Sequence, residues 1–144
     1  EEFVPAREIE VAVLGNEKPK ASNPGEIISS NDYYDYEAKY ISGTSQMQIP
    51  AVLPESTLEQ IREMAVTAYQ AINGSGLARV DFFVHKDNGQ IFINEINTMP
   101  GFTAYSMYPK MWEEAGLPYT DLITELIKLG IQRHQLKNAL NTSR

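Results

Sequence analysis

The sequence contains no cysteine among its 144 residues, which excludes disulfide bonds, thiolate metal ligands and cysteine nucleophiles. It also contains no apolar run approaching the ~20 residues that a membrane-spanning helix requires. No signal peptide is visible at its start. These absences favour a cytoplasmic protein that does not enter a membrane.

Positive charge is scarce in this sequence. It has 12 Lys and Arg residues against 19 Asp and Glu, a formal net charge of −7. That balance argues against nucleic acid or an anionic membrane surface as a partner. An anionic ligand must then be met by a few placed cations or by a metal ion. The 42% of hydrophobic and 22% of charged residues are typical of one globular domain with a core.

The first residues read "EEFVPAREIEVAVLG" and include no initiator methionine. A strand-like alternation of apolar and polar residues starts almost at once. We therefore expect the sequence to be part of a longer protein. A processed mature N-terminus is the alternative.

Apolar periodicity predicts a mixed α/β (α+β) domain, with a mainly antiparallel sheet flanked by helices. Ser56 is the expected N-cap of the first helix, and Gly74 is its expected stop. The tyrosine-rich segment 31–46 has no clean period and is expected to be an ordered functional loop. Strands are predicted at 9–13, 26–28 and 49–54 and in a hairpin within 76–101, and helices at 56–73, 105–118 and 119–134.

The last predicted helix carries apolar residues at helical spacing. We expect it to face the core with Leu122, Ile123, Leu126 and Ile127. The polar tail 135–144 that follows is expected to fray.

Charged and amide side chains interrupt the two apolar runs of the hairpin, where a packed core would not place them. Arg79 and Asp81 lie on the first run, and Glu95 and Asn97 lie on the second. Their presence near the same end of both runs indicates a site for a polar ligand.

The register of the hairpin decides whether these side chains meet. A two-residue turn at Asn88-Gly89 would place Asp81 and Glu95 on opposite faces of the sheet. A three-residue loop, with Gly89 left-handed, would instead place Asp81 opposite Glu95. The second register also pairs Arg79 with Asn97, Phe83 with Ile93, and Phe82 with Asn94.

Facing carboxylates repel by up to about 1 kcal/mol, and a cation between them reverses that sign. Asp, Glu and Asn supply hard oxygen ligands, which suit Mg²⁺ or Mn²⁺ rather than zinc. The alternative is a structural pair of carboxylates that Arg79 neutralises. Spacing alone leaves both interpretations open.

Five segments of the sequence form a specific combination: "EEFVPAREIEVAVLGN", "PGEI", "YDYEAKY", "ARVDFF" and "FINEINTMPGFTAYSMYP". They follow one another as they do in D-alanine–D-alanine ligases of the ATP-grasp superfamily, and the chain resembles the C-terminal portion of that family from Glu1 to about Leu129. The resemblance implies an ATP-grasp C-terminal domain. It also implies ATP-dependent joining of two D-alanine molecules through an acyl phosphate, for peptidoglycan in the bacterial cytoplasm.

The family's N-terminal domain and the first part of its nucleotide-binding domain are not in this sequence. The resemblance therefore implies that the isolated chain is inactive and that the full-length protein is a homodimer. Two alternatives are kept: another ATP-grasp ligase with a different acceptor, and a catalytically incomplete module that binds nucleotide or magnesium.

The resemblance assigns Asp81, Glu95 and Asn97 as ligands of two Mg²⁺ (or Mn²⁺) ions, with Glu95 between them, and it assigns Asn94 with Glu95 to cofactor binding. Arg79 matches the arginine that contacts the acyl phosphate and the tetrahedral intermediate. For Arg79 the alternative is a structural salt bridge to Asp81.

The resemblance assigns the second D-alanine to the segment after the hairpin. Gly101 is expected to bring its N–H near the developing oxyanion. Ser106, helped by the N–H of Met107, is expected to bind the carboxylate at the start of a helix that begins at Thr103. A turn glycine and a helix-capping serine are the alternatives.

The ATP assignments fall mostly near the beginning of the chain. Glu8 matches the acid that binds the ribose, a solvated strand-start carboxylate being the alternative. Lys39, in the mobile loop 31–46, matches the lysine that meets the γ-phosphate. Tyr40 beside it accompanies dipeptide rather than D-Ala–D-lactate synthesis. The adenine-binding linker is assigned to Glu1, Glu2, Phe3 and Val4.

No role is assigned to His85 or His134, which match no catalytic position of the family. None is assigned to Arg7 either, although an arginine beside Glu8 is common in the family.

Overall fold

The computed structural model describes residues 3–28, 46–103 and 105–140. In these ranges the chain forms a six-stranded sheet with strand order β4-β3-β1-β5-β6, and β2 pairs with β1. Every pairing is antiparallel, which confirms the predicted sheet type. The strands are β1 (Ala6–Gly15), β2 (Lys20–Ala21), β3 (Gly25–Ile28), β4 (Gln46–Gln48), β5 (Gly76–His85) and β6 (Ile91–Asn97).

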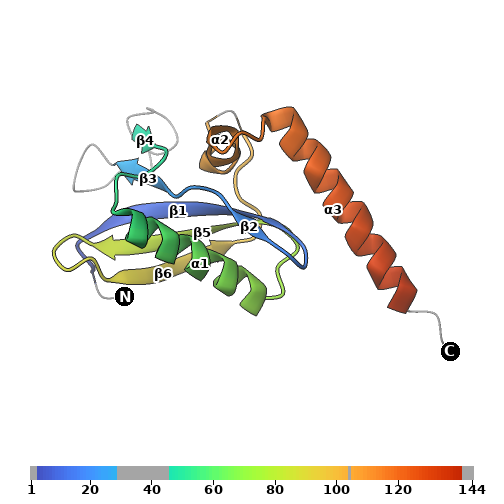
Figure 1. Cartoon of the computed structure of the whole chain (residues 1–144), viewed down its shortest axis with the longest axis horizontal. Helices are drawn as coiled ribbons and strands as arrows, with labels where there is room; N and C mark the ends of the chain where they lie inside the picture. Colours follow the sequence, from blue (N-terminus) through green and yellow to red (C-terminus); the bar gives the residue numbers. More distant parts are fainter. Residues whose placement is uncertain (1–2, 29–45, 104, 141–144) are drawn as a thin grey trace.

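Helices lie on both faces of this sheet: α1 (Glu55–Ala71), α2 (Met107–Glu114) and α3 (Tyr119–Leu140) (Figure 1). Side chains alternate between the two faces of a strand, and the central strand β1 shows this division. Its residues Ile9, Val11 and Val13 join the core cluster under α1, while Ala12 and Leu14 join the cluster with α2 and α3.

Helix α1 begins one residue before the predicted start, and the expected Ser56 cap is wrong. The N-cap is Pro54, whose carbonyl accepts hydrogen bonds from the N–H groups of Thr57 and Leu58 at 2.9 and 3.0 Å. The helix ends at Ala71, and the left-handed residue after it is Asn73, with φ of 54°. A backbone carbonyl therefore takes the place of the side-chain cap that the sequence favoured.

The strand predicted at 49–54 is wrong. β4 ends at Gln48, and the following segment is irregular. Proline has no N–H for a sheet ladder, and two of the six residues in this segment are proline. Ala51 instead donates one backbone hydrogen bond to Pro24 O at 2.8 Å.

Helix α3 is longer and less covered than predicted. It continues to Leu140, so the fraying expected from residue 135 is wrong for 135–140. Figure 1 shows α3 running away from the sheet. Leu122 is buried and Leu126 packs against the second cluster, but Ile123 and Ile127 are exposed. Among the described helices, none is long and apolar enough to cross a membrane.

Two buried tyrosines hold β1 from opposite faces. Tyr69 of α1 donates its hydroxyl to Gly15 O at 2.8 Å, and Tyr108 of α2 donates to Val13 O at 2.9 Å. Burial raises the pKa of Tyr69 to about 12 and also raises the pKa of Tyr108. Both hydroxyls therefore stay protonated donors at neutral pH and fix the end of β1 between the helices.

Replacing Tyr69 by Phe removes one of these donors and leaves Gly15 O buried without it. We expect the free energy of unfolding, measured by urea denaturation, to fall by about 1–3 kcal/mol. The matched control is Tyr119→Phe, whose hydroxyl makes a longer 3.3 Å bond to Phe102 O at an exposed position, and whose cost should stay within about 0.5 kcal/mol.

The same variant has a pH signature. The pKa of Tyr69 in the folded chain, about 12, lies above the value of about 10 for an unfolded tyrosine. Its contribution is therefore fully present below pH 10 and is lost as the pH rises through 12. Equal costs for Tyr69→Phe and Tyr119→Phe at neutral pH would contradict this assignment.

Candidate active site

A row of acidic side chains crosses three neighbouring strands. In the observed register, Glu10 of β1 lies opposite Asp81 of β5, and Asp81 lies opposite Glu95 of β6. Arg79 and Asn97 form the adjacent pair on β5 and β6. All five alternate with residues of the α1 face, so they share the face on which α2 and α3 pack.

The two site pairs of the second register, Asp81 with Glu95 and Arg79 with Asn97, are confirmed, although neither the two-residue turn nor the three-residue loop is present. The hairpin closes with a hydrogen bond from His85 N to Gln90 O at 2.9 Å, so four residues, not three, form the loop. An irregularity between Asp81 and Phe82 accommodates one extra residue of β6, Asn94. This bulge restores the register at Asp81 and Glu95.

The bulge also explains two wrong pairs. Phe82 lies opposite Ile93 rather than Asn94, and Phe83 lies opposite Phe92 rather than Ile93. Gly89 has φ of 69°, as predicted for a left-handed turn residue.

Arg79 is the cation of the acidic row. Its Nε and Nη2 donate to the two carboxylate oxygens of Asp81, both at 2.7 Å, and its Nε lies 3.2 Å from Oε2 of Glu10. Burial alone would lower the pKa of the guanidinium, but the hydrogen bonds to Asp81 and the surrounding carboxylate charges raise it above its ordinary value. The structural salt bridge that the sequence left open is therefore present.

The expected metal ligands share one face but do not form a ready cluster. Within 3–28, 46–103 and 105–140, no group of three or more His, Cys, Asp or Glu side chains is placed to hold a metal. Both oxygens of Asp81 bind Arg79, and Oδ1 of Asn97 accepts the N–H of Met99 at 3.1 Å.

The three residues nevertheless fit Mg²⁺ or Mn²⁺ in donor type. Asp81, Glu95 and Asn97 offer oxygen donors from two directly paired strands, and these ions prefer such donors. Glu95 is exposed, as is the bulge residue Asn94. Asp81 is the one carboxylate whose oxygens must leave Arg79 or be shared with it.

The expected ATP residues are only partly described. Glu8 is exposed on the same face of β1 as Glu10, which places it beside the acidic row. Val4 is partly buried just before β1, and Phe3 is 87% exposed. Glu1, Glu2, Lys39 and Tyr40 lie outside the described residues, as does the predicted loop 31–46 except Gln46, which begins β4.

The segment after β6 brings Gly101 and Ser106 together. A Cβ added at Gly101 would lie 2.9 Å from the Oγ of Ser106. That Oγ accepts the N–H of Thr103 at 2.9 Å and makes no capping bond to α2, although Ser106 is the N-cap. Helix α2 begins at Met107 rather than at Thr103. The first-turn N–H groups of α2 are thus left without a side-chain cap, a suitable place for a carboxylate.

Arg7 has a structural partner that the sequence did not reveal. It lies on the α1 face of β1, binds both carboxylate oxygens of Glu26 at 2.7 and 2.6 Å, and donates to Val52 O at 2.9 Å. Glu10 was also missed, although the alternation of β1 puts Glu8 and Glu10 on one face.

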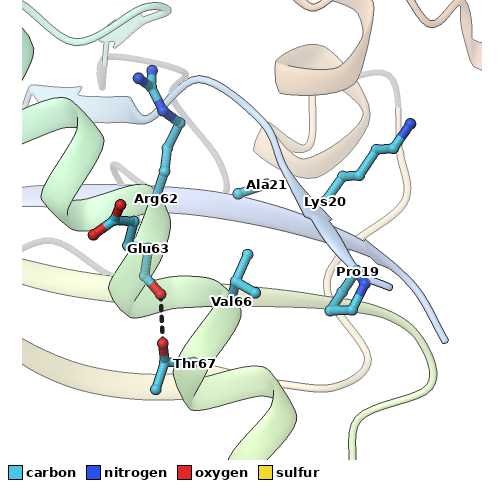
Figure 2. A pocket seen from close by; sticks show the side chains of 7 residues that line it. All are labelled: Pro19, Lys20, Ala21, Arg62, Glu63, Val66 and Thr67. Atoms are coloured by element: carbon cyan, nitrogen blue, oxygen red, sulfur yellow. Dashed lines mark hydrogen bonds between the residues drawn. The ribbon is translucent and has the colours of Figure 1, made fainter. Parts of the chain in front are cut away.

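A hollow of about 480 Å³ lies elsewhere, between β2 and α1 (Figure 2). The hydrogen bond drawn there joins Thr67 Oγ1 to Glu63 O at 2.8 Å within the helix. The hollow contains none of the predicted site residues, and the acidic row on the sheet face remains the candidate site. The hollow is lined by Pro19, Lys20, Ala21, Arg62, Glu63, Val66 and Thr67.

Comparison with known proteins identifies relatives of the whole chain. A D-alanine–D-alanine ligase of Acetivibrio thermocellus is 62% identical over 134 residues, covering 93% of this chain and 36% of the relative. The corresponding ligase of Oceanobacillus iheyensis is 56% identical, covering 100% of this chain and 39% of the relative. The chain thus spans well under half of the length of these curated relatives.

Solved structures agree with this relationship. The D-alanine–D-alanine ligase from Coxiella burnetii matches with a TM-score of 0.84 at 46% identity, covering 97% of this chain and 36% of that one. The VanG D-Ala:D-Ser ligase from Enterococcus faecalis matches with a TM-score of 0.77 at 38% identity, covering 89% and 37%. The predicted ATP-grasp fold class is therefore confirmed.

The family model described as "D-ala D-ala ligase C-terminus" matches residues 1–128. Together with the sheet and its acidic row, this match shows that the chain belongs to the C-terminal domain family of the D-alanine–D-alanine ligases.

Proposed function

We propose that this chain is the C-terminal catalytic portion of a bacterial enzyme that joins two D-alanine molecules with ATP, as a step of peptidoglycan synthesis in the cytoplasm. The observation that carries the proposal is the direct pairing of Asp81 with Glu95 beside a partly buried Arg79, in a chain of this family. The reaction has two steps. The carboxylate of the first D-alanine takes the γ-phosphoryl group of ATP, and the amine of the second then displaces phosphate.

Asp81, Glu95 and Asn97 would hold two divalent cations. Because three side chains supply few oxygen donors for two ions, Glu95 would be shared between them. Bound Mg²⁺ would neutralise the phosphate oxygens and orient the γ-phosphoryl group. Arg79 would stabilise the negative charge that develops on the acyl phosphate and on the tetrahedral intermediate. Its position in the row, next to the ligand pair, supports this role.

The second D-alanine would bind by its carboxylate at the start of α2. The uncapped N–H of Met107 and the hydroxyl of Ser106 would be the donors, and Gly101 would bring its own N–H to the reacting carbonyl. The contact between Gly101 and Ser106 supports a shared pocket. The buried side chain of Met107, packed near Gly25, leaves only its backbone for this role.

The nucleotide would bind along the first part of β1. The adenine edge would bind the backbone of the linker Glu1, Glu2, Phe3 and Val4, and the ribose would bind Glu8. Lys39 and Tyr40 would act from the loop 31–46, where closure excludes water from an acyl phosphate that would otherwise hydrolyse.

The site is incomplete in this chain alone. The acidic row ends at the exposed Glu95, and the relatives contain more than twice as many residues as this chain aligns with. The residues that complete the first D-alanine and triphosphate pockets would come from the preceding part of the full-length protein, which we expect to be a homodimer.

Substituting Glu95 by Gln in the full-length protein removes one carboxylate charge and keeps the side chain's size. We expect turnover to fall by at least about a hundredfold, since even outer partners of metal ligands cost that much. The measurement is phosphate release that depends on D-alanine. The control is Glu59→Gln, at an exposed position of α1. D-alanine-dependent release at the normal rate from Glu95→Gln would refute the metal assignment.

The isolated 144 residues should form no dipeptide, because half of the expected pocket is absent, and should bind ATP weakly at best. The full-length protein should form D-alanyl-D-alanine under the same conditions. Product analysis by mass spectrometry with D-Ala, D-Ser and D-lactate present also tests the acceptor. Robust dipeptide formation by the isolated chain would overturn the division of the site, and a product dominated by D-Ala–D-Ser or D-Ala–D-lactate would change the substrate.

Substituting Gly101 by Ala tests the second D-alanine pocket. The added Cβ would lie 2.9 Å from the Oγ of Ser106, so the hydroxyl must move. We expect the KM for the second D-alanine to rise roughly tenfold, with little change in the KM for ATP. Gly130→Ala in α3, where a Cβ meets nothing within 4 Å, is the control. Equal kinetics for both variants would rule out this pocket.

A further inference from the structure

Glu10 is a nearly buried carboxylate for which the function proposed above has no use. Its side chain is 13% exposed, and its Oε2 lies 3.2 Å from the Nε of Arg79, whose side chain is 19% exposed. It comes from β1, on the opposite side of Asp81 from Glu95. Arg79 therefore has two carboxylate partners from two different strands.

The two partners, Asp81 and Glu10, differ in whether they are also expected to bind the metal. Asp81 uses both oxygens on Arg79 at 2.7 Å, and the same oxygens are the expected metal donors. A cation at Asp81 and Glu95 must therefore draw Asp81 away from the guanidinium. A buried guanidinium that loses its partner is costly, so Arg79 needs a second anion that does not bind the metal.

Glu10 meets this requirement from its position. It lies on the far side of Asp81 from Glu95. Its Oε2 approaches Arg79 Nε at 3.2 Å, and the N–H of this Nε is donated to Asp81 Oδ1 at 2.7 Å, so departure of Asp81 frees that N–H for Glu10. The negative charges near Arg79 come from β1, β5 and β6, in the form of Glu10, Asp81 and Glu95. Of these three, Glu10 is the one outside the expected ligand pair.

We propose that Glu10 is a positioning residue, which holds Arg79 over the reacting groups while Asp81 serves a divalent cation. The inference rests on the proposed function for the identity of the reaction. Its own content is that Arg79 exchanges Asp81 for Glu10 as its carboxylate partner when the cation binds. Without Glu10, Asp81 is the one ion-pair partner left to Arg79 among residues 3–28, 46–103 and 105–140, and Arg79 competes with the cation for it. The simpler role for Glu10 would be an added negative charge that attracts the cation directly.

A double-mutant cycle separates the two roles. The probe is Mn²⁺ titrated into the full-length protein, with free Mn²⁺ measured by electron paramagnetic resonance. Glu10→Gln should weaken Mn²⁺ binding about tenfold, as outer partners of metal ligands do. In an Arg79→Met background the same substitution should change the affinity by less than about twofold. The same loss in both backgrounds would overturn the proposal.

A second variant covers the case in which Arg79→Met does not fold. Glu10→Asp keeps the charge but withdraws the carboxylate by one C–C bond, about 1.5 Å, which takes it out of reach of Arg79. Under the proposal Glu10→Asp weakens Mn²⁺ binding as Glu10→Gln does, and Glu59→Gln leaves it unchanged. Normal binding by Glu10→Asp would show a role through charge alone and overturn the proposal.

The kinetic readout keeps this inference separate from the proposed function. Glu10→Gln should lower kcat while the KM for ATP and the urea midpoint stay close to their original values, because the substitution displaces Arg79 and not the nucleotide. A protein that makes dipeptide but shows neither the Mn²⁺ nor the kcat effect keeps its function and loses this role for Glu10. A protein that shows the Mn²⁺ coupling but makes no dipeptide loses the function and keeps the positioning.

Discussion

One guanidinium balances the carboxylates that meet on the central strands, and the site depends on it. Glu10, Asp81 and Glu95 form a continuous row across β1, β5 and β6, and carboxylates that lie directly opposite each other destabilise a sheet. Arg79 enters the row from the same strand as Asp81 and ion-pairs with two of the three. The row can therefore form during folding without a metal ion, and Asp81 and Glu95, the proposed metal ligands, are in register before any ligand binds.

The two faces of the sheet are covered differently, and the charged row lies on the face that α1 does not cover. One face is closed by α1 over Ile9, Val11 and Val13, and the other is covered at one end by α2. Tyr69 and Tyr108 tie the end of β1 to both helices. The apolar packing and these two hydrogen bonds make a rigid support at one end of β1, while Glu8 and Glu95, at the two ends of the charged site, are exposed.

The sequence predicted the antiparallel sheet, the first helix and the two site pairs, but it could not predict every local detail. The pairing of Asp81 with Glu95 was correct although the loop has four residues, because the bulge at Asn94 compensates for the longer loop. Local patterns do not reveal such a bulge, since the residues on both sides still alternate. The predicted cap of α1 was wrong because the helix begins earlier than Ser56: its N-cap is Pro54, whose carbonyl accepts the N–H groups of Thr57 and Leu58, and Ser56 lies inside the first turn.

The contact between Glu10 and Arg79 could not be predicted from either sequence segment alone. The carboxylates of the hairpin are close in sequence, so a register argument brings them together, whereas β1 joins Arg79 only through long-range pairing with β5. Once that pairing is known, its register decides which acid of β1 can reach the guanidinium, because Glu10 lies opposite Asp81 while Glu8 lies opposite Phe83. Under the proposed role, a carboxylate outside the proposed ligand pair still affects it, because the cation and Arg79 compete for the oxygens of Asp81, and Glu10 holds Arg79 when Asp81 binds the cation.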